Sequence, residues 1–474
     1  MPTQQPDIKK SVEASFPPSQ TYLSSIWKRS SPEQKTTLSE QLKRINFKYV
    51  EAFMKKTESR PTMKIEPIPQ SSVKNLSTST VEHKECHTIG MKAISEGKLA
   101  VVTLAGGQGT RLGNTQPKGC YCVGNPSKKS LFQIQAERIR KVSQLANNGK
   151  TPSTIPWYIM TSTATSKQTV DFFKKNNFFG LSPTDVVFFN QGSFPSVDTK
   201  GNVFLENSTS IATSPNGNGG IYSALQEEGI LKDMEKRRIK YVQIATVDNV
   251  LLKVADPAFL GACIKEQVEI GCKSVKKETP EESVGVFCLK DGKLSVAEYS
   301  EIDDEQATRK DKQSEKLLFN QANIVSHIFT SEFLQQVCLK SSEVLYPHVA
   351  HKKITYFDSE KNQVVTPTEP NGFKMEYFLF DVFGLAKKFC IVETERSEEF
   401  APLKNAPGTP KDSPEAAKRK LKTLHLKYLK NAGAIFPDNF DEKTVECEIS
   451  PLTSYEGEGM EKYKGKKIEF PFVI

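Results

Sequence analysis

The chain of 474 residues carries a net charge of +9 at pH 7, is 37% hydrophobic and 26% charged, and contains nine cysteines. This is the composition of a globular protein of roughly two to three domains. The sequence has no apolar run of about 18 residues, which argues against a membrane span, and no secretory signal, which argues against secretion. It also lacks paired CxxC spacing, which argues against a disulfide or zinc framework. Because the lysines are interleaved with acidic residues and form no basic-aromatic cluster, we expect a cytoplasmic monomer that binds anionic small molecules, without nucleic-acid or membrane partners.

Residues 1–96 are predicted to form an N-terminal helical arm followed by a linker. The apolar residues after Ser31 recur at spacings of three and four, which places them on one face of a helix. They are Leu38, Leu42, Ile45, Tyr49 and Phe53. The next stretch, 60–80, is rich in Pro, Ser and Thr and is typical of a linker.

Residues 97–385 are predicted to form a doubly wound, mostly parallel, Rossmann-like α/β domain. Short apolar runs at 99–104, 157–160, 186–189 and 241–245 alternate with helix-sized segments such as 130–145 and 221–236. Strands that are apolar throughout are typical of a parallel sheet covered on both faces by helices. In such sheets ligands bind at the loops that follow the carboxyl ends of the strands.

The end of this domain and the tail complete the predicted architecture. After Gly372, apolar residues from Met375 to Phe383 fit one stripe of a helix that faces the core. Residues 386–474 are predicted to form a small α+β domain. It contains a helix capped by Ser413 with Pro414 in its first turn, followed by short strands near 445–449.

The stretch 101–113, VVTLAGGQGTRLG, runs from an apolar strand into a glycine-rich loop. Such a loop exposes backbone N–H groups to an anion, because glycine permits close approach of the backbone. The spacing does not fit the GxxxxGK[ST] of a Walker loop. It departs by one residue from the GxGxxG of a dinucleotide fingerprint, and Glu137, the acidic residue at about the right distance, lies in a helical pattern, so a dinucleotide site stays only a minor alternative. The remaining phosphate binder is a nucleotidyltransferase, in which Arg111 and Lys118 stabilise the negative charge that develops on a triphosphate during attack on its α-phosphorus. The alternative is that both are ordinary surface cations.

Asp248 follows the apolar strand at the carboxyl end of the predicted sheet, beside the glycine loop. This position suits Mg²⁺ or Mn²⁺, because Mg²⁺ prefers one or two carboxylates together with phosphate oxygens and water. The alternative is a turn aspartate that caps the following segment. Gln191 and Asn218 offer amide donors and acceptors, as a uracil edge and sugar hydroxyls require.

Ten motifs in this order resemble those of the eukaryotic UDP-N-acetylhexosamine pyrophosphorylases. They include LAGGQGTRLG, PKG, SPNGNGG, VDN and FAPLKN, and they occupy residues 104–113, 117–119, 130–133, 189–192, 214–220, 247–249, 282–285, 298–301, 323–325 and 400–405. The resemblance implies the reaction of UTP with N-acetylglucosamine 1-phosphate to give UDP-N-acetylglucosamine and pyrophosphate.

The resemblance also assigns roles to individual residues. It implies that Lys118 and the loop residues Leu104, Ala105, Gly106 and Gly107 bind the phosphates, and that Gln191 and Gly217 contact uracil. The residues implied on the sugar side are Asn218, Gly285, Glu298 and Asn323. Lys404 is implied to reach the phosphates from the C-terminal part, and Lys374 is implied to bind substrate.

Two alternatives and three departures from the family pattern remain. The chain can instead be a pyrophosphorylase for UDP-glucose or a broader set of UDP-sugars, although that branch lacks the loop arginine. It can also be a non-catalytic nucleotide-sugar-binding relative. Thr163, Asn216 and Ala322 replace residues that are usual in the family, and none of them removes a phosphate contact or the metal carboxylate. We expect Thr163 and Ala322 to influence affinity or sugar choice rather than chemistry.

Overall fold

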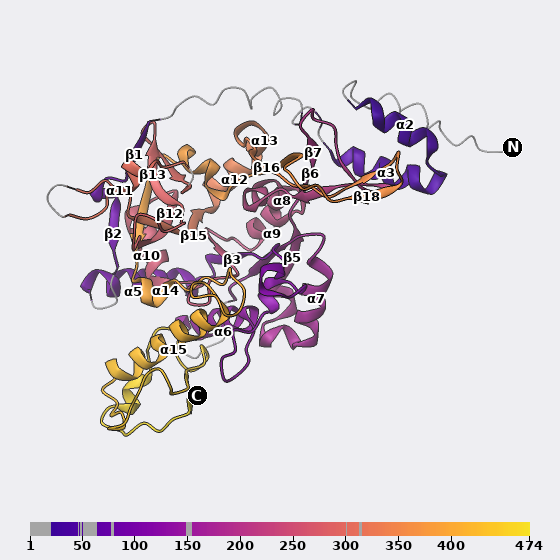
Figure 1. Cartoon of the computed structure of the whole chain (residues 1–474). Helices are drawn as coiled ribbons and strands as arrows, with labels where there is room; N and C mark the ends of the chain where they lie inside the picture. The colour runs from indigo at the N-terminus through magenta and orange to yellow at the C-terminus, as the bar shows by residue number, and fades with distance from the viewer. Residues whose placement is uncertain are drawn as a thin grey trace. The chain divides into compact units, whose positions relative to one another are not determined.

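The computed structural model describes residues 20–45, 47, 50, 64–76, 80–147, 154–299, 301–311 and 315–474 (Figure 1). The described residues divide into two compact units. Unit 1 draws on Met1–Met63, Gly192–Gly220 and Val344–Asp381, whereas unit 2 draws on Lys64–Gln191, Ile221–Glu343 and Val382–Ile474.

The predicted segments 1–96, 97–385 and 386–474 do not coincide with these units, and the three-part division stays a prediction. The predicted arm contributes to both units, and the predicted central domain is divided between them. The units are defined by contacts between segments that are distant in the sequence, and the order of elements along the chain does not reveal these contacts.

Unit 2 is built around an 11-stranded sheet with the main order β2-β20-β12-β15-β11-β3-β4-β5. Its strands are β1 (Ile65–Pro67), β2 (Val73–Asn75), β3 (Leu99–Leu104), β4 (Trp157–Thr161), β5 (Val186–Asn190), β11 (Tyr241–Thr246), β12 (Ile270–Lys276), β13 (Val286–Lys290), β14 (Lys293–Ala297), β15 (Gln321–Thr330) and β20 (Phe389–Glu393). The run β11, β3, β4, β5 is parallel, as are β12, β20 and β2. β15 is antiparallel to both β11 and β12. The predicted mostly parallel α/β sheet is therefore confirmed.

β3 has β4 on one side and β11 on the other, so the chain order reverses at β3. In doubly wound sheets the crevice at such a reversal, beyond the carboxyl ends of the strands, is the usual ligand site. The glycine loop leaves β3 at that end, and Asp248 follows β11 at the same end. The topology thus places both predicted features at one edge of the sheet.

The helices of unit 2 begin with side-chain caps at several points. Ser130 accepts a hydrogen bond from the N–H of Gln133, and Ser413 accepts one from the N–H of Ala416. The helices are α5 (Val81–Ser95), α6 (Leu131–Ala146), α7 (Ser166–Lys175), α8 (Ile221–Glu227), α9 (Ile230–Lys236), α10 (Pro257–Glu266), α11 (Asp304–Thr308), α12 (Ser331–Leu339), α14 (Arg396–Glu399) and α15 (Pro414–Asn431), with α13 (Ser341–Val344) at the junction to unit 1. The parallel pair β21 (Cys447–Glu448) and β22 (Phe472–Val473) lies in the tail.

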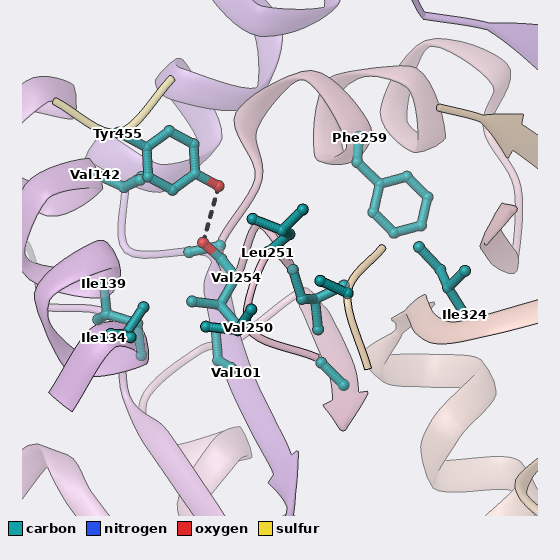
Figure 2. Packing of buried hydrophobic residues seen from close by; sticks show 14 of the residues in the cluster. Val101, Ile134, Ile139, Val142, Val250, Leu251, Val254, Phe259, Ile324 and Tyr455 are labelled. Carbon is teal, nitrogen blue, oxygen red and sulfur yellow. Dashed lines mark hydrogen bonds between the residues drawn. The ribbon is translucent and has the colours of Figure 1, made fainter. Parts of the chain in front are cut away.

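The core of unit 2 joins the sheet, the helices and the tail. Figure 2 shows Val101 of β3 near Ile134 and Ile139 of α6, with Tyr455 from the tail beside Val142. The Tyr455 hydroxyl donates a hydrogen bond of 3.0 Å to the carbonyl of Val254. The C-terminal residues therefore share the core of the sheet domain.

Unit 1 has a smaller core of its own. Its strands are β6 (Ser193–Pro195), β7 (Val197–Asp198), β8 (Leu205–Asn207), β9 (Ser210–Ile211), β10 (Thr213–Pro215), β16 (His348–Lys352), β17 (Tyr356–Asp358), β18 (Gln363–Val365) and β19 (Gly372–Glu376). α2 (Thr21–Arg29) and α3 (Pro32–Arg44) pack Ile26, Leu38 and Leu42 against Val197 and Met375. The amphipathic helix predicted after Ser31 is confirmed as α3 for Leu38 and Leu42. The helix ends at Arg44, so Ile45 is its extended C-cap, and Tyr49 and Phe53 lie outside the described residues.

The predicted strands at 99–104, 157–160, 186–189 and 241–245 and the tail helix are confirmed within a residue or so. The segment 221–236 forms two helices rather than one, because Gly229, with φ of 74°, separates them. No helix among the described residues is long and apolar enough to cross a bilayer.

Two element predictions are wrong. Residues 64–76, predicted as part of a linker, contribute β1 and β2 to the sheet of unit 2, where they pair with β13 and β20. The predicted helix after Gly372 is strand β19, which pairs with β16, followed by the 3-10 segment Leu379–Leu385. In both places pairing with distant strands overrides the local pattern.

Candidate active site

The loop after β3 closes on itself through backbone hydrogen bonds. The N–H of Lys118 donates to the carbonyl of Gly107 at 3.2 Å, and the N–H of Gly109 donates to the carbonyl of Gln116 at 3.0 Å. Gly113 has φ of 69°, a left-handed conformation that favours glycine. The loop is therefore an ordered hairpin that returns the chain to Lys118 at its base.

Gly106 and Gln191 are in close contact beside this loop. A Cβ added at Gly106 would lie 3.0 Å from Cδ and Nε2 of Gln191. The hydroxyl of Ser162 donates to the carbonyl of Gly106 at 2.8 Å, and the N–H of Ala105 donates to the carbonyl of Met160 at the same distance. Gly106 thus leaves room for the amide that the family resemblance assigns to uracil.

Arg111 and Lys118 present two cations with different surroundings. Arg111 is exposed on the short 3-10 turn Thr110–Leu112, whose Leu112 is buried, and it makes no ion pair within the described residues. Lys118 is half-buried, and its Nζ lies 3.1 Å from Oδ2 of Asp248. The loop therefore holds one paired lysine and one arginine available to an anion.

Asp248 sits at the end of β11 with both carboxylate oxygens engaged. Its Oδ1 accepts a hydrogen bond of 2.7 Å from the hydroxyl of Thr246, and its Oδ2 accepts one from Lys118. Burial raises the pKa of Asp248, but Lys118, Lys404 and these hydrogen bonds outweigh it and hold the pKa below its usual value. The carboxylate is therefore ionised at neutral pH.

Lys404 reaches this region on a segment that pairs with the residues around Asp248. The N–H of Leu403 donates to the carbonyl of Asp248 at 2.8 Å, and the N–H of Lys404 donates to the carbonyl of Asp412 at the same distance. The Lys404 side chain is exposed, and its charge contributes to the low pKa of Asp248. Three predicted phosphate-binding or metal-binding side chains thus gather at one edge of the sheet.

Gly285, Glu298 and Asn323 form a second group in unit 2. The N–H of Asn323 donates to the carbonyl of Gly285 at 2.8 Å, and a Cβ at Gly285 would lie 3.2 Å from Oε1 of Glu298. Oδ1 of Asn323 accepts from the N–H of Val325 at 2.8 Å, which leaves the amide nitrogen as its donor group. Three of the four residues assigned to the sugar therefore meet in unit 2.

Three predicted residues belong to unit 1. Gly217 has φ of 84°, and an added Cβ would lie 2.4 Å from the carbonyl oxygen of Tyr377, so only glycine fits. Oδ1 of Asn218 accepts a hydrogen bond of 2.8 Å from the N–H of Leu379. Lys374 is exposed on β19. The other predicted residues, from Leu104 to Lys404, lie in unit 2.

Three polar residues that support the site were not among the predicted ones. Thr246 bonds Asp248, Ser162 bonds the carbonyl of Gly106, and Asn249 binds the segment that carries Lys404 through both ends of its amide. Thr246 and Asn249 flank Val247 and Asp248 in the sequence, so their position beside the predicted carboxylate was the available signal.

The three departures from the family pattern occupy different environments. Thr163 is exposed, and Ala322 is packed in the core of unit 2. The Asn216 side chain is buried and fills the space beside Gly192 and Gly220, where added Cβ atoms would lie 2.9 and 1.9 Å from it. Ala322 therefore adds its methyl group to the hydrophobic core.

Comparisons with known proteins agree with this arrangement. The profile of the UDPGP family, described as UTP--glucose-1-phosphate uridylyltransferase, matches residues 43–409. UDP-N-acetylglucosamine pyrophosphorylase of Saccharomyces cerevisiae is 42% identical over 407 residues, which cover 85% of this chain and 84% of the yeast protein. UDP-N-acetylhexosamine pyrophosphorylase-like protein 1 of Homo sapiens is 46% identical over 428 residues, which cover 87% of this chain and 84% of the human protein.

A solved structure shares the whole fold. It is the uridine diphosphate N-acetylglucosamine pyrophosphorylase from Trypanosoma brucei in complex with an inhibitor, with a TM-score of 0.82 and 30% sequence identity. The match covers 97% of this chain and 95% of the trypanosomal one. These likenesses confirm the resemblance that the ordered motifs indicated.

Proposed function

The chain belongs to the UDPGP family of uridylyltransferases, and from this premise we propose that it makes UDP-N-acetylglucosamine and pyrophosphate from UTP and N-acetylglucosamine 1-phosphate. The observation that carries the proposal is the ion pair of Lys118 and Asp248 under the glycine loop, at the point where the sheet order reverses. Its relatives in Saccharomyces cerevisiae and Trypanosoma brucei carry the name of this activity.

In the proposed reaction a phosphate oxygen of the sugar phosphate attacks the α-phosphorus of UTP in line with the leaving group. The new P–O bond forms as the bond to the β-phosphate bridge breaks, and the electron pair leaves with pyrophosphate. The sugar phosphate is already an anion at neutral pH, so no general base is required. Positioning and charge neutralisation supply the rate, as in phosphoryl transfer generally.

Arg111, Lys118 and Lys404 are the proposed catalytic cations. Charge increases on the triphosphate as pyrophosphate leaves, and fixed cations stabilise that state more than the ground state. Arg111 is the cation of the loop without an ion pair in the described structure, so its charge is available to the phosphates. Lys118 is held by Asp248, and Lys404 stands on a segment bonded to the backbone of Asp248.

We propose that Asp248 holds the Mg²⁺ or Mn²⁺ ion. Its carboxylate is ionised and lies at the edge of the sheet where the triphosphate is proposed to bind, which fits an ion held by one carboxylate, phosphate oxygens and water. The described residues contain no cluster of three or more His, Cys, Asp or Glu side chains arranged around one point. The bound ion would supply charge neutralisation for the triphosphate.

On the substrate side, Gly106 and Gln191 are proposed to receive the uracil, together with Gly217. Gly285, Glu298, Asn323 and Asn218 are proposed to receive the sugar, and Lys374 is proposed to contribute to substrate binding. The contact of Gly106 with Gln191 and the meeting of Gly285, Glu298 and Asn323 support these roles.

The decisive experiment is a coupled pyrophosphate assay of the purified protein with UTP, Mg²⁺ and a panel of sugar 1-phosphates. We expect release only when a sugar phosphate is added, with the highest kcat/KM for N-acetylglucosamine 1-phosphate. A preference for glucose 1-phosphate would replace the proposed substrate by that of the UDP-glucose branch. UTP binding without release for any sugar phosphate would favour a non-catalytic nucleotide-sugar-binding protein.

We further propose that the protein acts as a monomer in the cytoplasm. All nine cysteines are free thiols, as expected in a reducing compartment. Size-exclusion chromatography with light scattering would measure the mass of the active species. Activity that elutes only with a dimer would contradict the proposed monomer.

A further inference from the structure

Lys273 is a buried lysine outside the proposed substrate site. The segment 394–405, called here the strap, connects Lys273 to that site. The strap runs antiparallel to the residues after β11, with the N–H of Val250 donating to the carbonyl of Ala401 at 3.1 Å and the N–H of Leu403 donating to the carbonyl of Asp248 at 2.8 Å. Lys404 lies near the C-terminal end of the strap. Its place beside Asp248 therefore depends on how the strap is fixed.

Glu399 is a buried charged residue of the strap, with 3% of its side chain exposed, and it follows Glu398, which is also buried and pairs with Lys427. One carboxylate oxygen accepts a hydrogen bond of 2.7 Å from the hydroxyl of Thr394, and the other pairs with Nζ of Lys273. The backbone carbonyl of Glu399 accepts a hydrogen bond of 2.7 Å from the amide of Asn249. Glu399 is thus held from the strap, from the sheet and from the segment next to Asp248.

Lys273 lies in β12, in the interior of the sheet, with 1% of its side chain exposed. Besides Glu399 it pairs with Asp256, whose other oxygen accepts the N–H groups of Ala258 and Phe259 at the start of α10. One buried cation therefore joins three elements: β12, the N-terminus of α10 and the strap.

Lys273 is the central charge of this arrangement. Removing one partner of a buried ion pair leaves an uncompensated charge, which is far more costly than losing an exposed pair. Without Lys273, the carboxylates of Asp256 and Glu399 would remain buried and lose the cation that contacts both, and only the more distant charge of Lys253 would offset their repulsion. We expect the strap to shift rather than β12 or α10, because the C-terminal end of the strap is less buried: Lys404 is exposed and Asn405 is half-buried.

We propose that Lys273 is a positioning residue for uridylyl transfer: by anchoring Glu399 it fixes the strap and holds Lys404 beside Asp248. This inference rests on the proposed function, because the role of Lys404 comes from it. The ammonium of Lys273 pairs with Asp256 and Glu399 rather than with a proposed substrate-binding residue, so its effect on the reaction passes through the strap. A purely structural lysine would instead lower stability without a specific effect on Lys404.

The first test compares Lys273→Met with Arg237→Met in the full chain without substrates. Arg237 is a matched control, because it also forms ion pairs in unit 2, with Asp233 at 2.8 Å and Asp185 at 3.0 Å, away from the strap. Hydrogen exchange should accelerate in residues 399–404 and 247–250 in Lys273→Met alone. Equal exchange of these segments in both variants would overturn the proposal.

The second test is a double-mutant cycle in the pyrophosphate assay. Lys273→Met should lower kcat by about tenfold or more with a smaller change in the KM for UTP, since misplacement of a positioned group acts on the transition state. In the Lys404→Met background the same substitution should have almost no further effect on kcat. Independent, multiplicative losses would overturn the proposal, whereas a wild-type enzyme without activity would refute the proposed function instead.

Glu399→Gln provides a second route if Lys273→Met does not fold. It removes the charge of the strap anchor but keeps its shape and its backbone bond to Asn249. We expect faster exchange of the strap and the same coupling to Lys404→Met, with a smaller loss of kcat. A Glu399→Gln enzyme with wild-type kcat and wild-type exchange would overturn the proposal.

Discussion

Nζ of Lys118 lies 3.1 Å from Oδ2 of Asp248, although 130 residues separate them in the chain. The contact joins the glycine loop after β3 to the residues after β11 and gives the site a fixed cation next to a fixed anion. Neither residue can move without changing the surroundings of the other. Their removal is therefore the most direct test of the proposed phosphate and metal site.

Lys118→Met and Asp248→Asn should each lower kcat by more than about tenfold, because both act on charge that develops in the transition state. The measurement is pyrophosphate release at saturating UTP and Mg²⁺. Lys167→Met is the control, since its ion pair with Asp171 is exposed and should contribute little. Wild-type kcat in folded Lys118→Met or Asp248→Asn protein would remove these residues from the mechanism.

Arg111→Ala should separate catalysis from stability. Arg111 is exposed and makes no ion pair in the part of the chain that the structure describes, so its loss should change the free energy of unfolding by no more than about 0.5 kcal/mol. Its kcat should nevertheless fall by more than about tenfold, since the loop loses its available cation. Urea unfolding and the pyrophosphate assay measure the two effects. An unchanged kcat would show that the backbone N–H groups of the loop suffice.

The sequence predicted the edge of the sheet where these residues meet because both strands that lead there are apolar throughout. β3 and β11 are buried along nearly their whole length, so their pattern is local and readable. Once two parallel strands are identified, the loops at their carboxyl ends must lie near one another. The proximity of Arg111, Lys118 and Asp248 follows from this, although the ion pair itself does not.

The parts that the sequence did not predict depend on pairings between distant segments. No hydrophobic periodicity in the sequence indicates that Asp248 pairs with Leu403 or that Val73 pairs with Ile391. Met375 to Phe383 fits a helical period, yet the strand β19 forms because β16 offers it a partner. Unit 1 is likewise assembled from three separate segments, which no local pattern announces.

Gly285→Ala should weaken sugar binding more than UTP binding. The added Cβ would lie 2.9 Å from Cγ1 of Val296 and 3.2 Å from Oε1 of Glu298, so the carboxylate proposed to receive sugar hydroxyls must shift. We expect the KM for the sugar phosphate to rise by about tenfold, roughly the value of one well-placed hydrogen bond to a charged group. Gly384→Ala is the control, since its Cβ would meet its nearest neighbour at 3.4 Å. Equal KM values for the sugar phosphate in the two variants would show that Glu298 does not bind the sugar.

His327 provides a prediction about stability and pH. It is fully buried in β15 between the rings of Phe287 and Phe383, at 6.1 and 4.9 Å between ring centroids, and neither of its ring nitrogens has a hydrogen-bond partner among the described residues. Burial lowers the pKa of His327 to about 3. In the unfolded chain the same imidazole titrates near 6.5, so between these values the unfolded state binds a proton that the folded state does not.

The free energy of unfolding should therefore fall as the pH drops below about 6.5, by about 1.4 kcal/mol for this residue between pH 7.5 and 5.5. His327→Phe removes that proton and the unsatisfied ring nitrogens while keeping an aromatic ring among aromatic neighbours. We expect it to be at least as stable as the wild type at pH 7.5 and to lose about 1.4 kcal/mol less on acidification to pH 5.5. Urea unfolding at both pH values measures the difference, and identical pH dependence in the two proteins would show that His327 gains a proton as readily folded as unfolded.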